Sequence, residues 1–142
     1  MIKKYVSLSQ AQKSVPVISR LMRDAMKLKK TLDELNTIEI EYDDTSSEDI
    51  DFIAMNKEFH RLSYQFYRKL EQIEFHGCMV KDVDMGLIDF ISLYEGREIC
   101  LCWRMGEENI EFYHEMDGGY ANRKPVKEIE QAEQDQKEIM NS

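Results

Sequence analysis

The stretch LIDFISLYEGREICLCWRMGEENIEFYH, residues 87–114, decides the fold that this sequence predicts. Apolar and polar residues alternate with a period of two over 87–93, 98–105 and 110–115, which is typical of β-strands with one buried face. A fourth strand is expected over 78–81, before the turn-forming segment DVDMG. Because short turns connect these strands in order, we predict an antiparallel β-meander.

Strand register decides which side chains share a face of this sheet. A two-residue turn at 95–96 pairs Asp89 with Cys102, whereas a turn centred on 107–108 places His114 on the opposite face from both. The expected inner face holds Ile88, Phe90, Ile99, Leu101, Trp103, Met105, Ile110, Phe112 and His114. The expected outer face, part apolar and part charged, holds Leu87, Asp89, Ile91, Leu93, Cys100, Cys102, Arg104, Glu111 and Tyr113. One β-bulge would reverse the assignment of His114, because it shifts the alternation by a residue.

Two long helices are expected before the sheet. Ser7 and Gln10 have the spacing of a capping box, and Pro16 predicts a kink or a short first helix that ends near Ser14. Apolar residues then recur three and four positions apart, which indicates a coiled-coil-like seam. They are Ile18, Leu21, Ala25, Leu28, Leu32 and Leu35 in the first helix, and Phe52, Met55, Phe59, Leu62, Phe66 and Ile73 in the second.

An acidic loop at 42–49 separates the helices, with Thr45 and Glu48 as a second capping box, and Gly77 suits the end of the second helix. We therefore predict an α+β protein in which an antiparallel helical hairpin, 7–77, packs on a β-meander, 78–125. Together these form one domain, 1–125. The remaining 126–142 is an acidic tail, expected to be frayed helix or disordered.

The charge balance disfavours some classes of partner. The 142 residues include 19 Lys and Arg against 28 Asp and Glu, a net charge of −9 that repels nucleic acid. A local basic cluster, which we interpret as a solvated helix face, consists of Arg20, Arg23, Lys27, Lys29 and Lys30. No secretory signal or membrane helix is expected, and three unpatterned cysteines favour the cytoplasm.

The cysteines alone predict no metal centre and no other cofactor. Cys100 and Cys102 form a CxC pair, to which Cys78 adds only one further thiol. Strong zinc signatures carry two spaced pairs, because zinc takes about four ligands. We therefore interpret these residues as small buried hydrophobes.

Other polar residues admit two interpretations. His114 is either a base or ligand oriented by Asp89, or a structural histidine at the end of the core. Arg123, in GGYANRKP, either grips an anionic ligand or pairs with a nearby acid such as Glu107. The helical histidines, His60 and His76, are expected at the surface or at the helix end.

The segments KDVDMGLIDF, GREICLCWRMGEENIEFYHEMDGG and NRKP, with the opening SLSQAQKSVPVI, resemble the prokaryotic domain-of-unknown-function family numbered 2203. The resemblance runs from about Tyr5 to Pro125, with Ile91 where members usually carry proline and Tyr113 where they usually carry tryptophan. It implies a small cytoplasmic protein with a helical hairpin and a β region, and it implies no activity. The positions that match the family's motif give a candidate cluster of Asp89, Glu107, His114 and Arg123.

Two functions are compatible with these patterns. The first is a non-catalytic interaction or assembly protein that forms a homodimer, and it rests on the heptad seam and on the half-apolar outer face of the sheet. The alternative is a small-ligand-binding protein, a metal-binding protein or an enzyme that uses the candidate cluster. Contact between the imidazole of His114 and the carboxylate of Asp89 would favour the alternative.

Overall fold

The computed structural model describes residues 4–43 and 51–141, which form helices on one face of a single sheet. The elements are α1 (Leu8–Asp43), α2 (Phe52–Glu74), β1 (Cys78–Asp82), β2 (Leu87–Tyr94), β3 (Arg97–Arg104), β4 (Phe112–Glu115), the short 3₁₀ helix η1 (Tyr120–Asn122), β5 (Lys124–Pro125) and α3 (Lys127–Asn141). The strands follow sequence order in the sheet, β1-β2-β3-β4-β5, and each pairs antiparallel with the next. The predicted α+β class and antiparallel meander are therefore confirmed, although β5 was not predicted.

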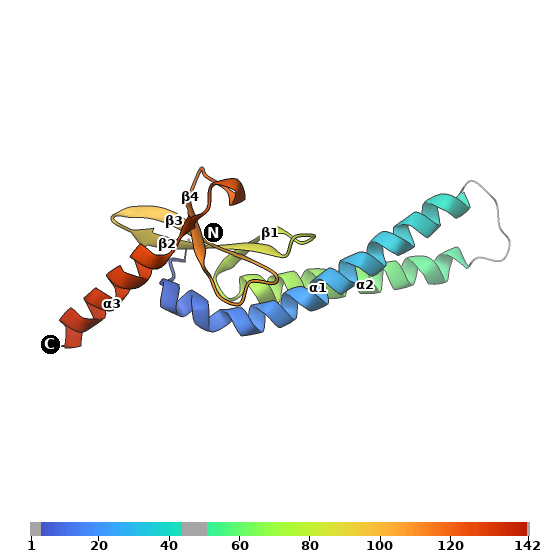
Figure 1. Cartoon of the computed structure of the whole chain (residues 1–142). Coiled ribbons are helices and arrows are strands. Elements are labelled where there is room, and N and C mark those ends of the chain that lie inside the picture. Colours follow the sequence, from blue (N-terminus) through green and yellow to red (C-terminus); the bar gives the residue numbers. More distant parts are fainter. Residues whose placement is uncertain (1–3, 44–50, 142) are drawn as a thin grey trace.

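Helices α1 and α2 lie side by side, and the outer part of their hairpin projects beyond the sheet (Figure 1). With 36 residues, α1 is about 54 Å long at 1.5 Å per residue. The first half of α1 packs on the sheet through Ala11, Val15, Ile18 and Met22. In its second half, Ala25 and Leu32 pack against Leu62 and Phe66 of α2. The apolar seam is thus buried within one chain.

Pro16 lies inside α1, so of the two alternatives the short first helix that ends near Ser14 is wrong. A proline within a helix costs about 3 kcal/mol, because it removes one N–H donor and crowds the preceding turn. Val15 and Ile18 are buried beside it, and burying one such side chain stabilises the fold by roughly 1.5–3 kcal/mol. Burial of this stretch against the sheet therefore outweighs the cost of the proline.

The helix ends follow sequence signals where the structure describes them. The side chain of Gln10 accepts from Ser7 N at 3.0 Å, and the hydroxyl of Ser7 accepts from Gln10 N at 3.1 Å, which confirms the first capping box. The second capping box lies at 45–48, outside the described residues. Helix α2 instead has Asp51 as its N-cap, whose carboxylate accepts from Ala54 N at 3.0 Å.

The β2–β3 hairpin has the predicted register, with Asp89 opposite Cys102. Glu95 and Gly96 both adopt positive φ angles, 51° and 75°, as a type I′ turn requires. The inner face of the sheet holds Ile88, Phe90, Ile99, Leu101 and Trp103, which pack against α1.

The predicted β3–β4 register is wrong by one residue. Cys100 lies opposite His114 and Cys102 lies opposite Phe112, so these two β4 residues belong to the outer face and Tyr113 to the inner one. The inner and outer residues of β4 are therefore exchanged relative to the prediction, which is the outcome that a β-bulge was expected to produce. The loop between these strands spans 105–111, so it is longer than the turn expected between strands at 98–105 and 110–115.

Hydrogen bonds from β3 and from α1 hold this loop in place. The indole N–H of Trp103 donates to the carbonyl of Glu107 at 2.9 Å, and the Glu107 carboxylate accepts from Arg104 N at 2.7 Å. From α1, the side-chain amide of Gln12 both donates to and accepts from the backbone of Ile110, at 2.8 Å each. Ile110 is buried in the core, so its backbone depends on this amide for hydrogen bonding.

The tail contains α3, whose beginning packs on the rest of the molecule. Val126 and Ile129 are buried in the main core. The carboxylate of Glu133 accepts from Leu8 N at 2.8 Å and from Ser9 N at 3.2 Å. These N–H groups begin α1 and have no partner within that helix, so α3 caps α1. No helix among the described residues is long and apolar enough to cross a membrane.

Candidate metal centre

Three neighbouring strands place Asp89, Cys102 and His114 together on the outer face of the sheet. Asp89 comes from β2, Cys102 from β3 and His114 from β4. Each offers one possible ligand atom, and these atoms all lie within 4.8 Å of one another. The residues are only 4%, 0% and 4% exposed. The expectation that His114 is separated from Asp89 by the sheet is therefore wrong.

The hydrogen bonds of His114 determine which ring nitrogen carries a proton. Nδ1 lies 2.8 Å from the carbonyl oxygen of Glu115, which only accepts, so Nδ1 is the donor. In a neutral imidazole, Nε2 then carries a lone pair. Nε2 faces the Asp89 carboxylate and lies 3.2 Å from both of its oxygens. A lone pair and a carboxylate repel each other, so this arrangement calls for a proton or a metal cation between them.

The spacing and chemistry of these donors suit a transition metal. Bonds of about 2.0–2.1 Å from zinc to nitrogen and oxygen give a tetrahedral ligand-to-ligand distance of about 3.3 Å. The Nε2–Oδ distances of 3.2 Å are close to this value. A histidine ligand normally donates its other N–H to a carbonyl or carboxylate, as Nδ1 of His114 does to Glu115.

Cys102 adds a soft sulfur donor in a setting that disfavours its free thiolate. Burial, followed by the charge of Asp89, raises the pKa of the Cys102 thiol to about 12, although the positive charge of Arg123 opposes this shift. The thiol is therefore protonated at neutral pH unless a cation replaces the proton.

The other two cysteines have different surroundings. Cys78 donates from Sγ to the carbonyl of Ile73 at 3.3 Å inside the core. Cys100 shares the outer face with Cys102, and its Sγ lies 3.5 Å from Sδ of Met116. Neither belongs to the group of three ligand atoms identified among the described residues.

Glu107 and Arg123, the other two members of the candidate cluster, form an ion pair beside this centre. Nη2 of Arg123 donates to Oε2 of Glu107 at 2.5 Å. The guanidinium lies 4.2 Å from the ring centroid of Phe112 and 4.7 Å from that of Tyr120. It is therefore held between two aromatic rings, over the cross-strand partner of Cys102. The Arg123 side chain is 10% exposed, and its Nε is buried with no hydrogen-bond partner among the described residues.

The structure thus divides the predicted cluster into two contacts, Asp89 with His114 and Glu107 with Arg123. Sequence reasoning left Cys102 out of the cluster because the CxC pair lacks a second pair. The available signal was the correct pairing of Cys102 with Asp89 in the β2–β3 hairpin. The helical His60 is exposed and lies in edge contact with Phe59 at 5.9 Å, away from this centre.

A comparison with protein families places the chain in a known family. The model described as "Uncharacterized conserved protein (DUF2203)" matches residues 4–126, a range that includes the whole candidate centre. Searches of curated proteins and of solved structures found no match. The geometry of the centre is therefore the basis for its proposed chemistry.

Proposed function

The chain belongs to the DUF2203 family, whose description assigns no activity, and from the geometry of the centre we propose that the protein binds a transition-metal ion, zinc above all, through Asp89, Cys102 and His114. The observation that carries this proposal is the position of Nε2 of His114, equidistant from both oxygens of Asp89 at 3.2 Å. With Nδ1 donating to a carbonyl, a bound cation satisfies Nε2, the carboxylate and the thiolate together.

Three protein ligands leave one tetrahedral position for water or for the anionic group of a small ligand. Arg123 and Glu107 border the centre, and the unsatisfied Nε of Arg123 supplies an N–H donor for such a group. This combines the two parts of the candidate cluster in one binding site. We propose binding, and no reaction, for this site.

Elemental analysis of protein purified without a histidine tag tests the metal. We expect close to one zinc ion per chain, and strong loss of zinc in Cys102→Ser and in His114→Gln. The matched control is Cys100→Ser, which changes a buried thiol on the same face outside the group of three and should retain the metal. Cobalt substitution should give thiolate-to-metal charge-transfer absorption that disappears in Cys102→Ser and persists in Cys100→Ser. Absence of metal from wild type, or equal loss from both serine variants, would contradict the proposal.

A second candidate function is assembly into a homodimer, and the outward surface of α2 supports it. Ile53, Tyr64 and Tyr67 are 75%, 70% and 62% exposed and recur at helical spacing on the side of α2 away from α1. The two features that first suggested a homodimer are buried within the chain, since the seam joins α1 to α2 and the centre of the outer face is covered. The surface of α2 therefore replaces them as the proposed contact with a second copy.

Light scattering during size exclusion tests this assembly. We expect a dimer that dissociates when Tyr64 and Tyr67 are both changed to lysine, because charge opposes burial of that surface. Met140→Lys, which changes an apolar residue that is 79% exposed on α3, is the control and should leave the dimer intact. A wild-type protein that stays monomeric at high concentration would exclude this candidate.

We also propose that the α1–α2 hairpin is a coiled coil and that the protein acts in the cytoplasm. Residues from the two predicted seams, among them Leu32 and Phe66, pack together, which supports the first proposal. All three cysteines are free, which fits a reducing compartment. Fractionation of cells that produce the full chain would test the location.

A further inference from the structure

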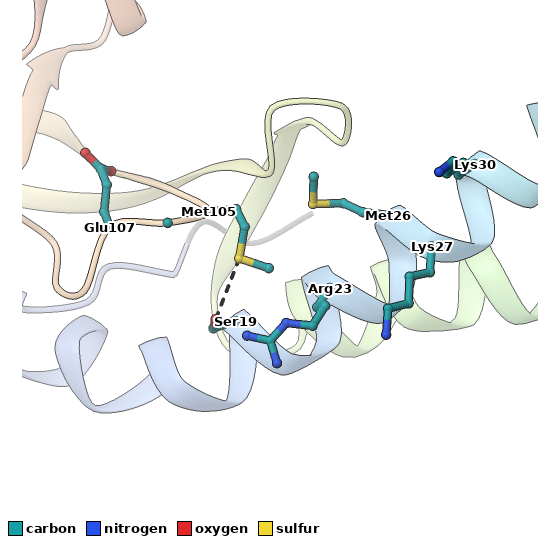
Figure 2. Close-up of a pocket in the computed structure, with 8 residues that line it drawn as sticks. Ser19, Arg23, Met26, Lys27, Lys30, Met105 and Glu107 are labelled. Carbon is teal, nitrogen blue, oxygen red and sulfur yellow. Dashed lines mark hydrogen bonds between the residues drawn. The ribbon is translucent and has the colours of Figure 1, made fainter.

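A hollow of about 690 Å³ lies between the middle of α1 and the loop that follows β3 (Figure 2). Its lining residues are Ser19, Arg23, Met26, Lys27, Lys30, Met105, Gly106 and Glu107. We call it the α1 pocket. Its volume falls within the range of about 300–1,000 Å³ that is usual for sites of small molecules.

The α1 pocket has a concentrated positive charge. Arg23, Lys27 and Lys30 lie on successive turns of α1, and none forms an ion pair with a described residue. Elsewhere in the basic cluster, Lys29 contacts Asp33 at 3.0 Å and Asp84 at 2.9 Å. Arg23, Lys27 and Lys30 are exposed, as the interpretation of a solvated helix face expects, and their charged groups are therefore accessible to a ligand in the hollow.

The acidic residue in the lining does not neutralise them. The carboxylate of Glu107 bonds to Arg104 N and to the guanidinium of Arg123. Figure 2 shows it turned away from α1. Three cations thus border one hollow in a chain of net charge −9, where many carboxylates are available as partners. An anionic ligand would relieve their mutual repulsion.

Two methionines supply an apolar part of the same wall. Sδ of Met105 lies 3.7 Å from the hydroxyl of Ser19, which orients its thioether. Gly86 makes room for both methionines, because a Cβ there would lie 2.5 Å from Cβ of Met105 and 3.4 Å from Sδ of Met26. Thioethers make favourable contacts with aromatic rings, so this wall suits a flat, unsaturated group.

We propose that the α1 pocket binds a small phosphorylated molecule with a flat ring system, of the class of nucleoside di- and triphosphates. The three cations hold the phosphate chain, and Met26 and Met105 contact the ring. Arg23 and Lys30 are separated by seven residues, about 10 Å along the helix, so their flexible side chains converge on a polyphosphate from both ends. The α1 pocket shares Glu107 with the surroundings of the metal centre but none of the three proposed metal ligands, and the proposal does not rest on that centre.

The ligand is a small molecule because the chain as a whole carries an excess of negative charge outside this basic cluster. A long nucleic acid would also meet the surrounding surface of a chain with net charge −9, which repels it. A free nucleotide places its few charges inside the pocket alone.

Isothermal titration calorimetry with the full chain tests this assignment, using ATP without divalent cations. We expect ATP to bind and Lys27→Gln to weaken binding roughly tenfold or more, because a charged contact to phosphate is lost. Lys57→Gln removes the same charge from the exposed side of α2, outside the pocket, and should bind ATP like wild type. Absence of ATP binding, or equal weakening in both variants, would overturn the proposal.

Comparison of ligands tests the two halves of the site. Adenosine and tripolyphosphate should each bind more weakly than ATP, because each lacks one set of contacts. Equal affinity for ATP and tripolyphosphate would overturn the role of the methionines. A single-stranded oligonucleotide that binds more tightly than ATP would overturn the small-molecule assignment. Zinc content should be the same in Lys27→Gln and wild type, so this test fails or succeeds independently of the metal centre.

Discussion

At the scale of single residues, burial controls the chemistry of the cysteines. Cys78, Cys100 and Cys102 are at most 4% exposed. Burial raises the pKa of Cys78 and Cys102 to about 12 and that of Cys100 to about 11. The nucleophile in thiol reactions is the thiolate, so these residues are both shielded and held in their unreactive form.

We therefore expect the native protein to resist a disulfide reagent such as Ellman's reagent at about pH 8, near the pKa of an ordinary cysteine thiol. Absorbance should report three thiols after denaturation and almost none before it. Rapid modification of Cys102 in the folded chain, located by mass spectrometry, would show that the outer face of the sheet opens readily.

The ion pair of Arg97 with Glu115 gives stability a dependence on pH. Nε of Arg97 donates to Oε1 of Glu115 at 2.5 Å, and this hydrogen bond lowers the pKa of Glu115. A lowered pKa in the folded state stabilises the protein above the ordinary carboxyl pKa. That stability is lost as the pH falls through the lowered value.

Arg97→Gln should therefore be less stable than wild type at about pH 6, with the difference shrinking toward about pH 3. Urea unfolding followed by circular dichroism at several pH values measures this change. A difference that stays constant with pH would show that Arg97 contributes through packing, including its contact with the ring of Tyr94, and not through charge.

At the scale of elements, the two hairpins show what a sequence can and cannot determine. The β2–β3 register follows from Glu95 and Gly96, because local backbone preference fixes a two-residue turn. The loop between β3 and β4 is held by hydrogen bonds from Gln12, which is 98 residues away from Ile110 in the chain. No local pattern contains that contact, so His114 was assigned to the wrong face and Cys102 was left out of the candidate cluster, although Asp89 and His114 were both named in it. The α+β class depends only on periodicity and was predictable.

Gln12→Ala should lower the free energy of unfolding by about 1–3 kcal/mol, because it leaves the buried backbone of Ile110 without its partner. Urea denaturation measures the change. Gln65→Ala, on the exposed surface of α2, is the control and should change stability by less than about 0.5 kcal/mol. Similar effects of the two substitutions would mean that the β3–β4 loop does not need Gln12.

Pro16→Ala should increase the stability of α1. Alanine restores a backbone N–H inside the helix and removes the crowding of the proline ring, for a gain of about 1–3 kcal/mol. The thermal midpoint should rise accordingly. A decrease would indicate that the proline is needed for Val15 and Ile18 to pack on the sheet.

At the scale of the whole molecule, hydrogen bonds from backbone N–H groups at the start of α1 to a carboxylate of α3 connect the first and last helices. Glu133 lies 125 residues from Leu8, yet its carboxylate caps the start of α1. The tail has few apolar residues and high charge, which predicted either frayed helix or disorder, whereas the structure buries Val126 and Ile129. Docking of α3 depends on surfaces formed by the rest of the fold, which composition alone does not describe.

Glu133→Gln should lower the free energy of unfolding by about 0.5–2 kcal/mol, the usual value of a helix cap, since the amide keeps only one acceptor oxygen and no charge. Glu138→Gln removes the same charge from an exposed position on α3 and serves as the control. Hydrogen exchange should show faster exchange at the N–H groups of Leu8 and Ser9 only in the first variant. Equal exchange in both would show that α3 does not protect α1.

The origin of Asp89, Cys102 and His114 on three successive strands has a mechanical consequence. An ion held by all three would cross-link β2, β3 and β4 in the middle of the sheet. It would join positions 25 residues apart in the chain, so the unfolded chain could not retain it in the same geometry. The melting temperature would then rise with the concentration of free metal ion. A chelator would destabilise the sheet before it affected the projecting part of the helical hairpin.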